Sequence, residues 1–161
     1  MARAVQISVI GAAEADEVVL RDAEEIGRRI AQAGAVLVCG GRSGVMEAAS
    51  KGAAEAGGTV VGILPTLSTD DANPHVTHPI ATGIGQARNL AVVASGAAVV
   101  AVGGEWGTLS EIAYARKLGR PVVAIQSWAL RNRSGTDLGI VEAESPEEAV
   151  TAALTAATAQ P

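Results

Sequence analysis

Short apolar segments alternate along the chain with segments of helical periodicity, and this alternation limits the fold more than any other feature. The segments expected to form strands are residues 5–10, 35–39, 59–64, 97–102, 121–126 and 138–141. Five helices are expected. Two span residues 15–33 and 83–95, two others begin after glycine-rich segments and end near residues 56 and 118, and the last runs from Ser145 to about residue 157. The alternation predicts an α/β, Rossmann-like fold, with a mostly parallel sheet of about six or seven strands and helices on both faces.

The composition agrees with a buried parallel sheet. Hydrophobic residues make up 48% of the 161 residues, yet the chain has no Phe, one Tyr and two Trp. The core must therefore be built from Val, Ile, Leu and Ala, which suits strands that are covered on both faces. The length is that of one ordinary domain, so we expect residues 1–161 to form a single nucleotide- or phosphate-binding domain.

Charge and cysteine content exclude several classes of partner. The net charge of −5 and the absence of a basic stripe argue against nucleic acid. No apolar run approaches the roughly 20 residues that span a bilayer, and the N-terminus lacks the pattern of a signal peptide. The lone Cys39, which we expect to be a small buried residue, rules out an internal disulfide. We therefore expect a cytoplasmic protein without a membrane partner.

The first glycine-rich segment follows an expected strand and opens an expected helix. It consists of Gly40, Gly41, Arg42, Ser43 and Gly44. Glycines let the backbone turn sharply and approach a ligand, while a helix N-terminus adds free amides and partial positive charge. Together these features predict an anion site, to which Arg42 or Ser43 adds a side chain. The alternative is a plain turn in which Ser43 caps the helix.

A second segment has the same placement between strand and helix. It comprises Gly103, Gly104, Glu105, Trp106, Gly107 and Thr108. Neither segment is a Walker loop or a dinucleotide fingerprint, so a mononucleotide or another phosphomonoester fits better than ATP or NAD. Thr108 is the preferred phosphate ligand in this segment. Trp106 either stacks on a base or pterin ring or packs against another subunit.

The paired segments resemble the LOG-like family. The resemblance rests on Gly40-Gly41-x-x-Gly-x-Met, on Gly103-Gly104-x-x-Gly-Thr-x-x-Glu, and on the intervening Gly85-Gln86-Ala87-Arg88-Asn89. This family contains cytokinin-activating phosphoribohydrolases and proteins once labelled putative lysine decarboxylases. The pattern is most similar to the subgroup of molybdenum cofactor carrier proteins. The resemblance covers about residues 5–125 and implies a Rossmann-like fold assembled as dimers or larger oligomers.

The resemblance makes Arg88 and Glu111 the catalytic pair if the protein is a hydrolase. In N-glycosidic cleavage a carboxylate stabilises the oxocarbenium-like sugar or activates water, and Arg88 would hold the phosphate or stabilise the leaving base. Three departures leave hydrolysis open. Val102 replaces the proline of the Pro-Gly-Gly-x-Gly-Thr-x-x-Glu motif, whose loop is one residue shorter, and Asn89 stands where the family tends to have Lys.

Both residues also have simpler interpretations. Glu111 lies three residues after Thr108, which is the spacing of a capping box with Thr108 as the N-cap. Arg88 could be a solvated residue on a helix.

The remaining polar residues carry weaker signals. His75 and His78 lie near Asp70 and Asp71 in the long segment 65–79, which we expect to be a lid or rim, and we expect no metal site there. Pyridoxal-phosphate-dependent decarboxylation is rejected because Lys51 and Lys117 both lie inside expected helices.

The leading hypothesis is a binding or carrier protein that needs no cofactor. Its small phosphorylated ligand would be an AMP- or GMP-like nucleotide or a phosphorylated pterin such as molybdenum cofactor. The alternatives are a nucleoside 5′-monophosphate phosphoribohydrolase and a structural or interaction protein whose loops are turns, so whether the chain is an enzyme stays open. A homodimer or higher homo-oligomer is expected.

Overall fold

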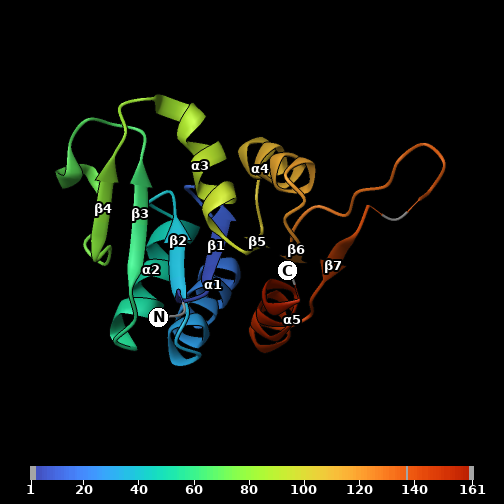
Figure 1. Ribbon diagram of the computed structural model, residues 1–161, viewed down its shortest axis with the longest axis horizontal. Helices are drawn as coiled ribbons and strands as arrows, with labels where there is room; N and C mark the ends of the chain where they lie inside the picture. Colours follow the sequence, from blue (N-terminus) through green and yellow to red (C-terminus); the bar gives the residue numbers. More distant parts are fainter. Residues whose placement is uncertain (1–2, 137, 160–161) are drawn as a thin grey trace.

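The computed structural model describes residues 3–136 and 138–159. The ends of the expected domain (residues 1–2 and 160–161) and the last residue of the connection at 127–137 lie outside the described residues. The described chain contains one seven-stranded sheet in the order β4-β3-β2-β1-β5-β6-β7, with every neighbouring pair parallel (Figure 1). The expected Rossmann-like sheet is therefore confirmed.

The strands and helices lie close to the expected ranges. The strands are β1 (Gln6–Gly11), β2 (Val36–Cys39), β3 (Val60–Leu64), β4 (His78–Ala81), β5 (Ala98–Val102), β6 (Val122–Ile125) and β7 (Ile140–Glu142). The helices are α1 (Glu17–Gln32), α2 (Val45–Glu55), α3 (Arg88–Ser95), α4 (Trp106–Lys117) and α5 (Pro146–Thr158), with short 3-10 turns η1 (Thr69–Asp71) and η2 (Gly85–Ala87).

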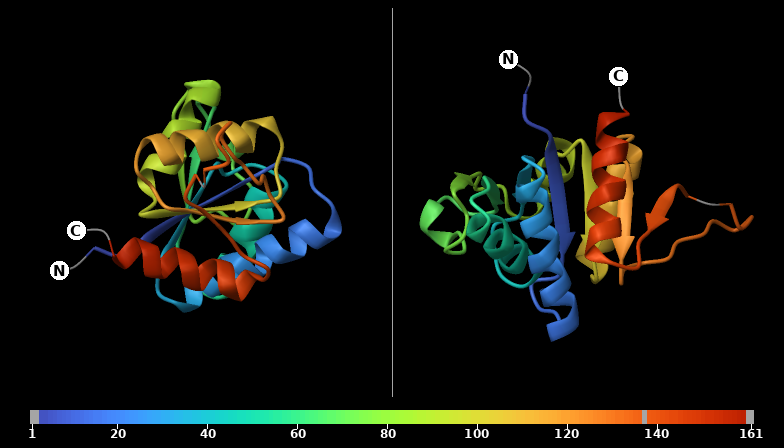
Figure 2. Two further views of the ribbon diagram at one scale, coloured as in Figure 1. Left: turned by 90° about the vertical axis from the view of Figure 1, so that its right-hand side faces the viewer. Right: turned by 90° about the horizontal axis from the view of Figure 1, so that it is seen from below.

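Helices cover both faces of the sheet. Helices α1, α2 and α5 lie on one face, and α3 and α4 lie on the other (Figure 2). Each face has its own apolar core, in which Ile26, Ile30 and Ala149 represent the first layer, and Val92 and Ile112 the second. All five residues of β5 are buried, as expected for a central parallel strand that is covered on both sides.

The chain changes direction across the sheet at β1. Strands β2, β3 and β4 extend to one side of β1, and β5, β6 and β7 extend to the other. In open parallel sheets this reversal opens a crevice beyond the carboxyl ends of the two central strands, where ligands bind. The loop after β1 and the glycine segment after β5 both begin at this crevice.

Three expectations about boundaries were wrong. The segment 65–79 is not all loop, because residues 78–81 form β4 at the edge of the sheet, where Pro79 is tolerated. The helix expected at 83–95 begins only at Arg88, after the turn η2. Helix α4 begins at Trp106 rather than after Thr108. No helix in the described part of the chain is long and apolar enough to cross a membrane.

Candidate functional site

A cavity of about 550 Å³ opens at the crevice between the carboxyl ends of β1 and β5. Seven of the expected site residues line it: Arg42, Ser43, Arg88, Glu105, Gly107, Thr108 and Glu111. The sequence interpretation missed eight others: Gly11, Ala12, Ala13, Met46, Pro65, Thr66, Gln86 and Asn89. Five expected glycines (Gly40, Gly41, Gly44, Gly103 and Gly104) and Trp106 do not line it.

The first glycine segment is fastened to the loop after β1. The amide of Val45 donates to Ala12 O at 3.0 Å, and Ser43 Oγ donates to Ala13 O at 3.1 Å. Gly44, with φ +67°, is the N-cap of α2, and a Cβ there would collide with the Ala13 carbonyl group. The interpretation of Ser43 as the N-cap is therefore wrong, because its hydroxyl donates outward to Ala13 instead of accepting from the helix.

The second glycine segment leaves the start of α4 uncapped. The N-cap Glu105 makes no side-chain hydrogen bond, and Leu109 N is the first amide of the helical ladder, bonded to Glu105 O at 3.0 Å. Within the described residues, nothing accepts a hydrogen bond from the amides of Trp106, Gly107 and Thr108. By contrast, Asp16 caps α1 and Ser145 caps α5. The open amides of α4 therefore stand beside the cavity with the positive end of the helix dipole.

Glycines shape this second segment without entering the cavity. Gly104 has φ +119°, and a Cβ there would lie 2.5 Å from Thr108 Cβ. Thr108 itself is only 2% exposed. The backbone of Gly104 thus packs directly on the side chain that we expected to bind phosphate, and a larger residue would displace that side chain.

Arg88 is buried beneath the first glycine segment. It is 7% exposed, so the interpretation of a solvated arginine is wrong. Its Nη2 donates to Gly40 O at 3.3 Å and its Nη1 donates to Asn89 Oδ1, while its buried Nε has no partner among the described residues. Burial lowers the pKa of this guanidinium, and the nearby Glu111 carboxylate partly offsets that effect.

Glu111 also lines the cavity, from the second turn of α4. It is 8% exposed, and burial raises its pKa to about 7, although the positive charge of Arg88 opposes the shift. The expected capping box with Thr108 is wrong, because Thr108 is the third residue of α4 and not its cap. Glu111 is therefore free of a capping role, and its carboxyl group exchanges a proton near neutral pH inside the cavity.

Trp106 lies at the outer edge of the segment. Trp106 is 76% exposed, and its ring packs against that of Trp128, with centroids 5.3 Å apart and planes tilted by 39°. Trp128 Nε1 in turn donates to Glu105 O at 3.2 Å. No sequence pattern indicated that Trp128, in the connection after β6, would pack against Trp106.

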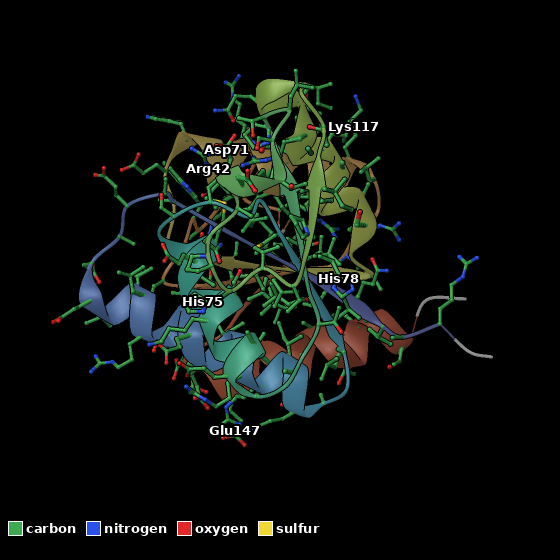
Figure 3. All side chains as sticks on the ribbon, turned by 90° about the vertical axis from the view of Figure 1, so that its left-hand side faces the viewer. Arg42, Asp71, His75, His78, Lys117 and Glu147 are labelled. Carbon is green, nitrogen blue, oxygen red and sulfur yellow. The ribbon has the colours of Figure 1, made fainter. Side chains whose placement is uncertain are left out.

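The weaker candidates lie apart from the cavity. His75 lies in the segment that joins β3 to β4, and His78 is the first residue of β4. The two side chains are well apart, and Lys117 lies far from both (Figure 3). The described residues contain no group of three His, Cys, Asp or Glu side chains arranged to hold a metal. Cys39 is fully buried, as expected, and its Sγ accepts a hydrogen bond from Gly41 N at 3.3 Å.

Comparison with known proteins agrees with this architecture. The model of the SLOG cluster4 family matches residues 4–150. An uncharacterized protein of Archaeoglobus fulgidus is 45% identical over 146 residues, which are 91% of this chain and 92% of that protein.

Two solved structures are similar over nearly their whole length. A molybdenum cofactor binding protein from Rippkaea orientalis superposes with a TM-score of 0.86 at 36% identity, covering 95% of this chain and 97% of that one. The molybdenum cofactor carrier protein of Chlamydomonas reinhardtii superposes with a TM-score of 0.85 at 37% identity, covering 98% and 100%. These matches confirm the resemblance that the two glycine segments indicated, and the chain belongs to the SLOG cluster4 family.

Proposed function

We propose that the protein binds a small phosphorylated ligand in the cavity between β1 and β5 and acts as a binding or carrier protein. The observation that carries the proposal is the uncapped N-terminus of α4, whose open amides adjoin a cavity walled by the buried Arg88. The amides at a helix end without side-chain partners are free to bind an anion, and the helix dipole favours negative charge there.

The phosphate would lie against the start of α4. The amides of Gly107 and Thr108 and the Thr108 hydroxyl are the expected donors, and Arg88 and Arg42 supply positive charge. The expected glycines act indirectly, by allowing close packing around the cavity. Gly44 lets the first segment approach the loop after β1, Gly40 packs on Arg88, and Gly104 packs on Thr108. Gly41 and Gly103 pack against Leu64 and Val19, respectively. The cavity volume of about 550 Å³ falls within the usual range for small-molecule sites.

The ligand class follows from size and from the relatives. A nucleoside monophosphate or a phosphorylated pterin of the molybdenum cofactor type suits the cavity. The names of two structural relatives, a molybdenum cofactor binding protein and a carrier protein, favour the pterin. The ligand would be cargo rather than a resident cofactor. The reducing cytoplasm, where the buried Cys39 thiol stays unpaired, is the proposed compartment.

A phosphoribohydrolase is the second candidate, and Glu111 favours it. A carboxyl group with a pKa of about 7, buried beside a cationic side chain, can both hold and release a proton during N-glycosidic cleavage. Free base released from AMP or GMP, and lost in Glu111→Gln, would identify an enzyme. Intact nucleotide together with thermal stabilisation by the ligand would identify a carrier.

We also propose that the protein is a homodimer that pairs through α3 and α4. Leu90, Tyr114 and Leu118 are half-exposed on this face. A groove of about 500 Å³ runs between the two helices and shares Gln86, Asn89 and Gly107 with the ligand cavity. A second copy laid on this face would bury the apolar side chains and close the cavity on that side.

Calorimetric titration with GMP, AMP and inorganic phosphate tests the ligand proposal. Thr108→Val keeps the shape of the side chain but removes its hydroxyl, so we expect about tenfold weaker binding. Thr155→Val, on the exposed side of α5, is the matched control and leaves affinity unchanged. Absence of heat and of thermal stabilisation with nucleotides, phosphate and molybdenum cofactor would contradict the proposal.

A further inference from the structure

Asn73 joins the segment between β3 and β4 to the first glycine segment. Its backbone N donates to Gly41 O at 2.8 Å, and its side-chain Nδ2 donates to Arg42 O at 2.9 Å. Its Oδ1 accepts from His75 N at 3.1 Å, which closes a local turn. Asn73 is buried, so its donors satisfy two consecutive carbonyl groups of the glycine segment away from solvent.

The two carbonyl bonds determine where the next amides point. In a trans peptide the N–H lies opposite the C=O, and the described chain has no cis peptide. Because the Gly41 and Arg42 carbonyls both face Asn73, the N–H groups of Arg42 and Ser43 both face away from it. No described residue accepts a hydrogen bond from either amide, and both residues line the cavity.

We propose that Asn73 is a positioning residue for the anion site: it orients the Arg42 and Ser43 amides as a second pair of donors, facing the pair at the start of α4. Successive backbone amides on one side of a loop form an anion-binding concavity. This inference rests on the proposed ligand binding and extends it to a residue outside the cavity wall.

The same segment also holds the side chain of Arg42. Arg42 Nη1 donates to Asp71 O at 3.4 Å, and the two residues lie side by side in Figure 3. The segment expected to be a lid thus braces the first glycine segment through Asp71 and Asn73. An aspartate at position 73 could still accept from His75 N, but it would place a carboxylate oxygen against the Arg42 carbonyl in place of a donor.

The test follows backbone amide resonances during titration with inorganic phosphate and with GMP. In the wild-type protein we expect shifts at Arg42 and Ser43 as well as at Gly107 and Thr108. In Asn73→Asp we expect the Arg42 and Ser43 shifts to be lost and the affinity for phosphate to fall about tenfold. The Gly107 and Thr108 shifts should remain, which a general loss of structure would not allow.

Asn132→Asp is the matched control. Asn132 Oδ1 also accepts from a backbone amide, that of Thr136 at 2.8 Å, in the exposed connection between β6 and β7 far from the cavity lining. This variant should bind phosphate and GMP like the wild type.

The outcomes separate this inference from the proposed function. If no amide of either pair moves in the wild type, both are wrong. If only Gly107 and Thr108 move, or if Asn73→Asp binds and shifts like the wild type, the role of Asn73 is wrong and the proposed function stands. Should Asn73→Asp fail to fold, the wild-type titration alone still decides whether Arg42 and Ser43 are donors.

Discussion

Replacing Gly107 with alanine should stabilise the fold and weaken ligand binding. One added methyl group would thus change the two free energies in opposite directions. Gly107 is the second residue of α4 and lines the cavity. An added Cβ would meet no heavy atom within 4 Å, and the φ of Gly107 is not positive. Nothing in the described fold therefore requires glycine at this position.

The two magnitudes follow from that geometry. Alanine is favoured over glycine in a helix by about 0.5–1 kcal/mol, which corresponds to a rise in melting temperature of about 1–4 °C for a chain of this length. A methyl group in the space beside the Gly107 amide would obstruct one hydrogen bond to a charged ligand. Such a bond is worth about 1.5–3 kcal/mol, so binding should weaken about 10- to 100-fold.

Calorimetry and thermal melting of the same samples provide the assay. Thr151→Ala is the control, because Thr151 is exposed on α5 and lines neither the cavity nor the groove between α3 and α4. We expect this variant to retain wild-type affinity for GMP and phosphate. A Gly107→Ala protein that melts higher yet binds GMP and phosphate as tightly as the wild type would refute the assignment of the anion to the start of α4.

Three further changes test other parts of the account. The folded pKa of Glu111 is about 7 against an unfolded value of 4.5, so the unfolded chain loses this proton first and stability falls as pH rises from about 4.5 to about 7. In urea unfolding, the free energy of unfolding of the wild type should be up to about 3 kcal/mol lower at pH 8 than at pH 5. This loss should be absent in Glu111→Gln and present in the exposed Glu144→Gln. An equal loss in all three proteins would contradict the burial argument. Gly52→Ala should destabilise the fold by about 1–3 kcal/mol, since its Cβ would meet the Glu24 carbonyl where α1 and α2 touch, and unchanged urea unfolding would show that the helices can separate. Light scattering should show monomers for Tyr114→Arg and dimers for Tyr114→Phe. If the mass of Tyr114→Arg equals that of the wild-type protein, α3 and α4 do not form the dimer interface.

The architecture was predictable from the sequence because its signals are local and repeated. The strand–helix alternation predicted the parallel sheet, and the residues after Ser145 predicted α5, whose cap accepts from Glu148 N at 3.2 Å. The edge strand β4 was missed because a polar segment that contains Pro79 lacks the sequence pattern of a strand. Only its pairing with β3 makes it one.

The candidate site was predictable where chemistry is visible in single residues. Arg42, Arg88, Thr108 and Glu111, which the sequence indicated as candidate site residues, all line the cavity. Ala13 was not foreseen, because alanine carries no chemical signal and only the reversal of strand order at β1 brings it there.

The capping prediction for Thr108 failed for a related reason. Threonine is a good N-cap, but the backbone turn after Gly104 starts the helix two residues before it, at Trp106. The local preference of one residue was overridden by the loop that joins β5 to α4.

A crystal structure of the protein with GMP tests the central claim most directly. The account predicts that the phosphate lies within hydrogen-bond distance of the Gly107 and Thr108 amides and faces Arg88, with the rest of the ligand in the cavity between β1 and β5. A phosphate bound elsewhere on the protein would contradict it.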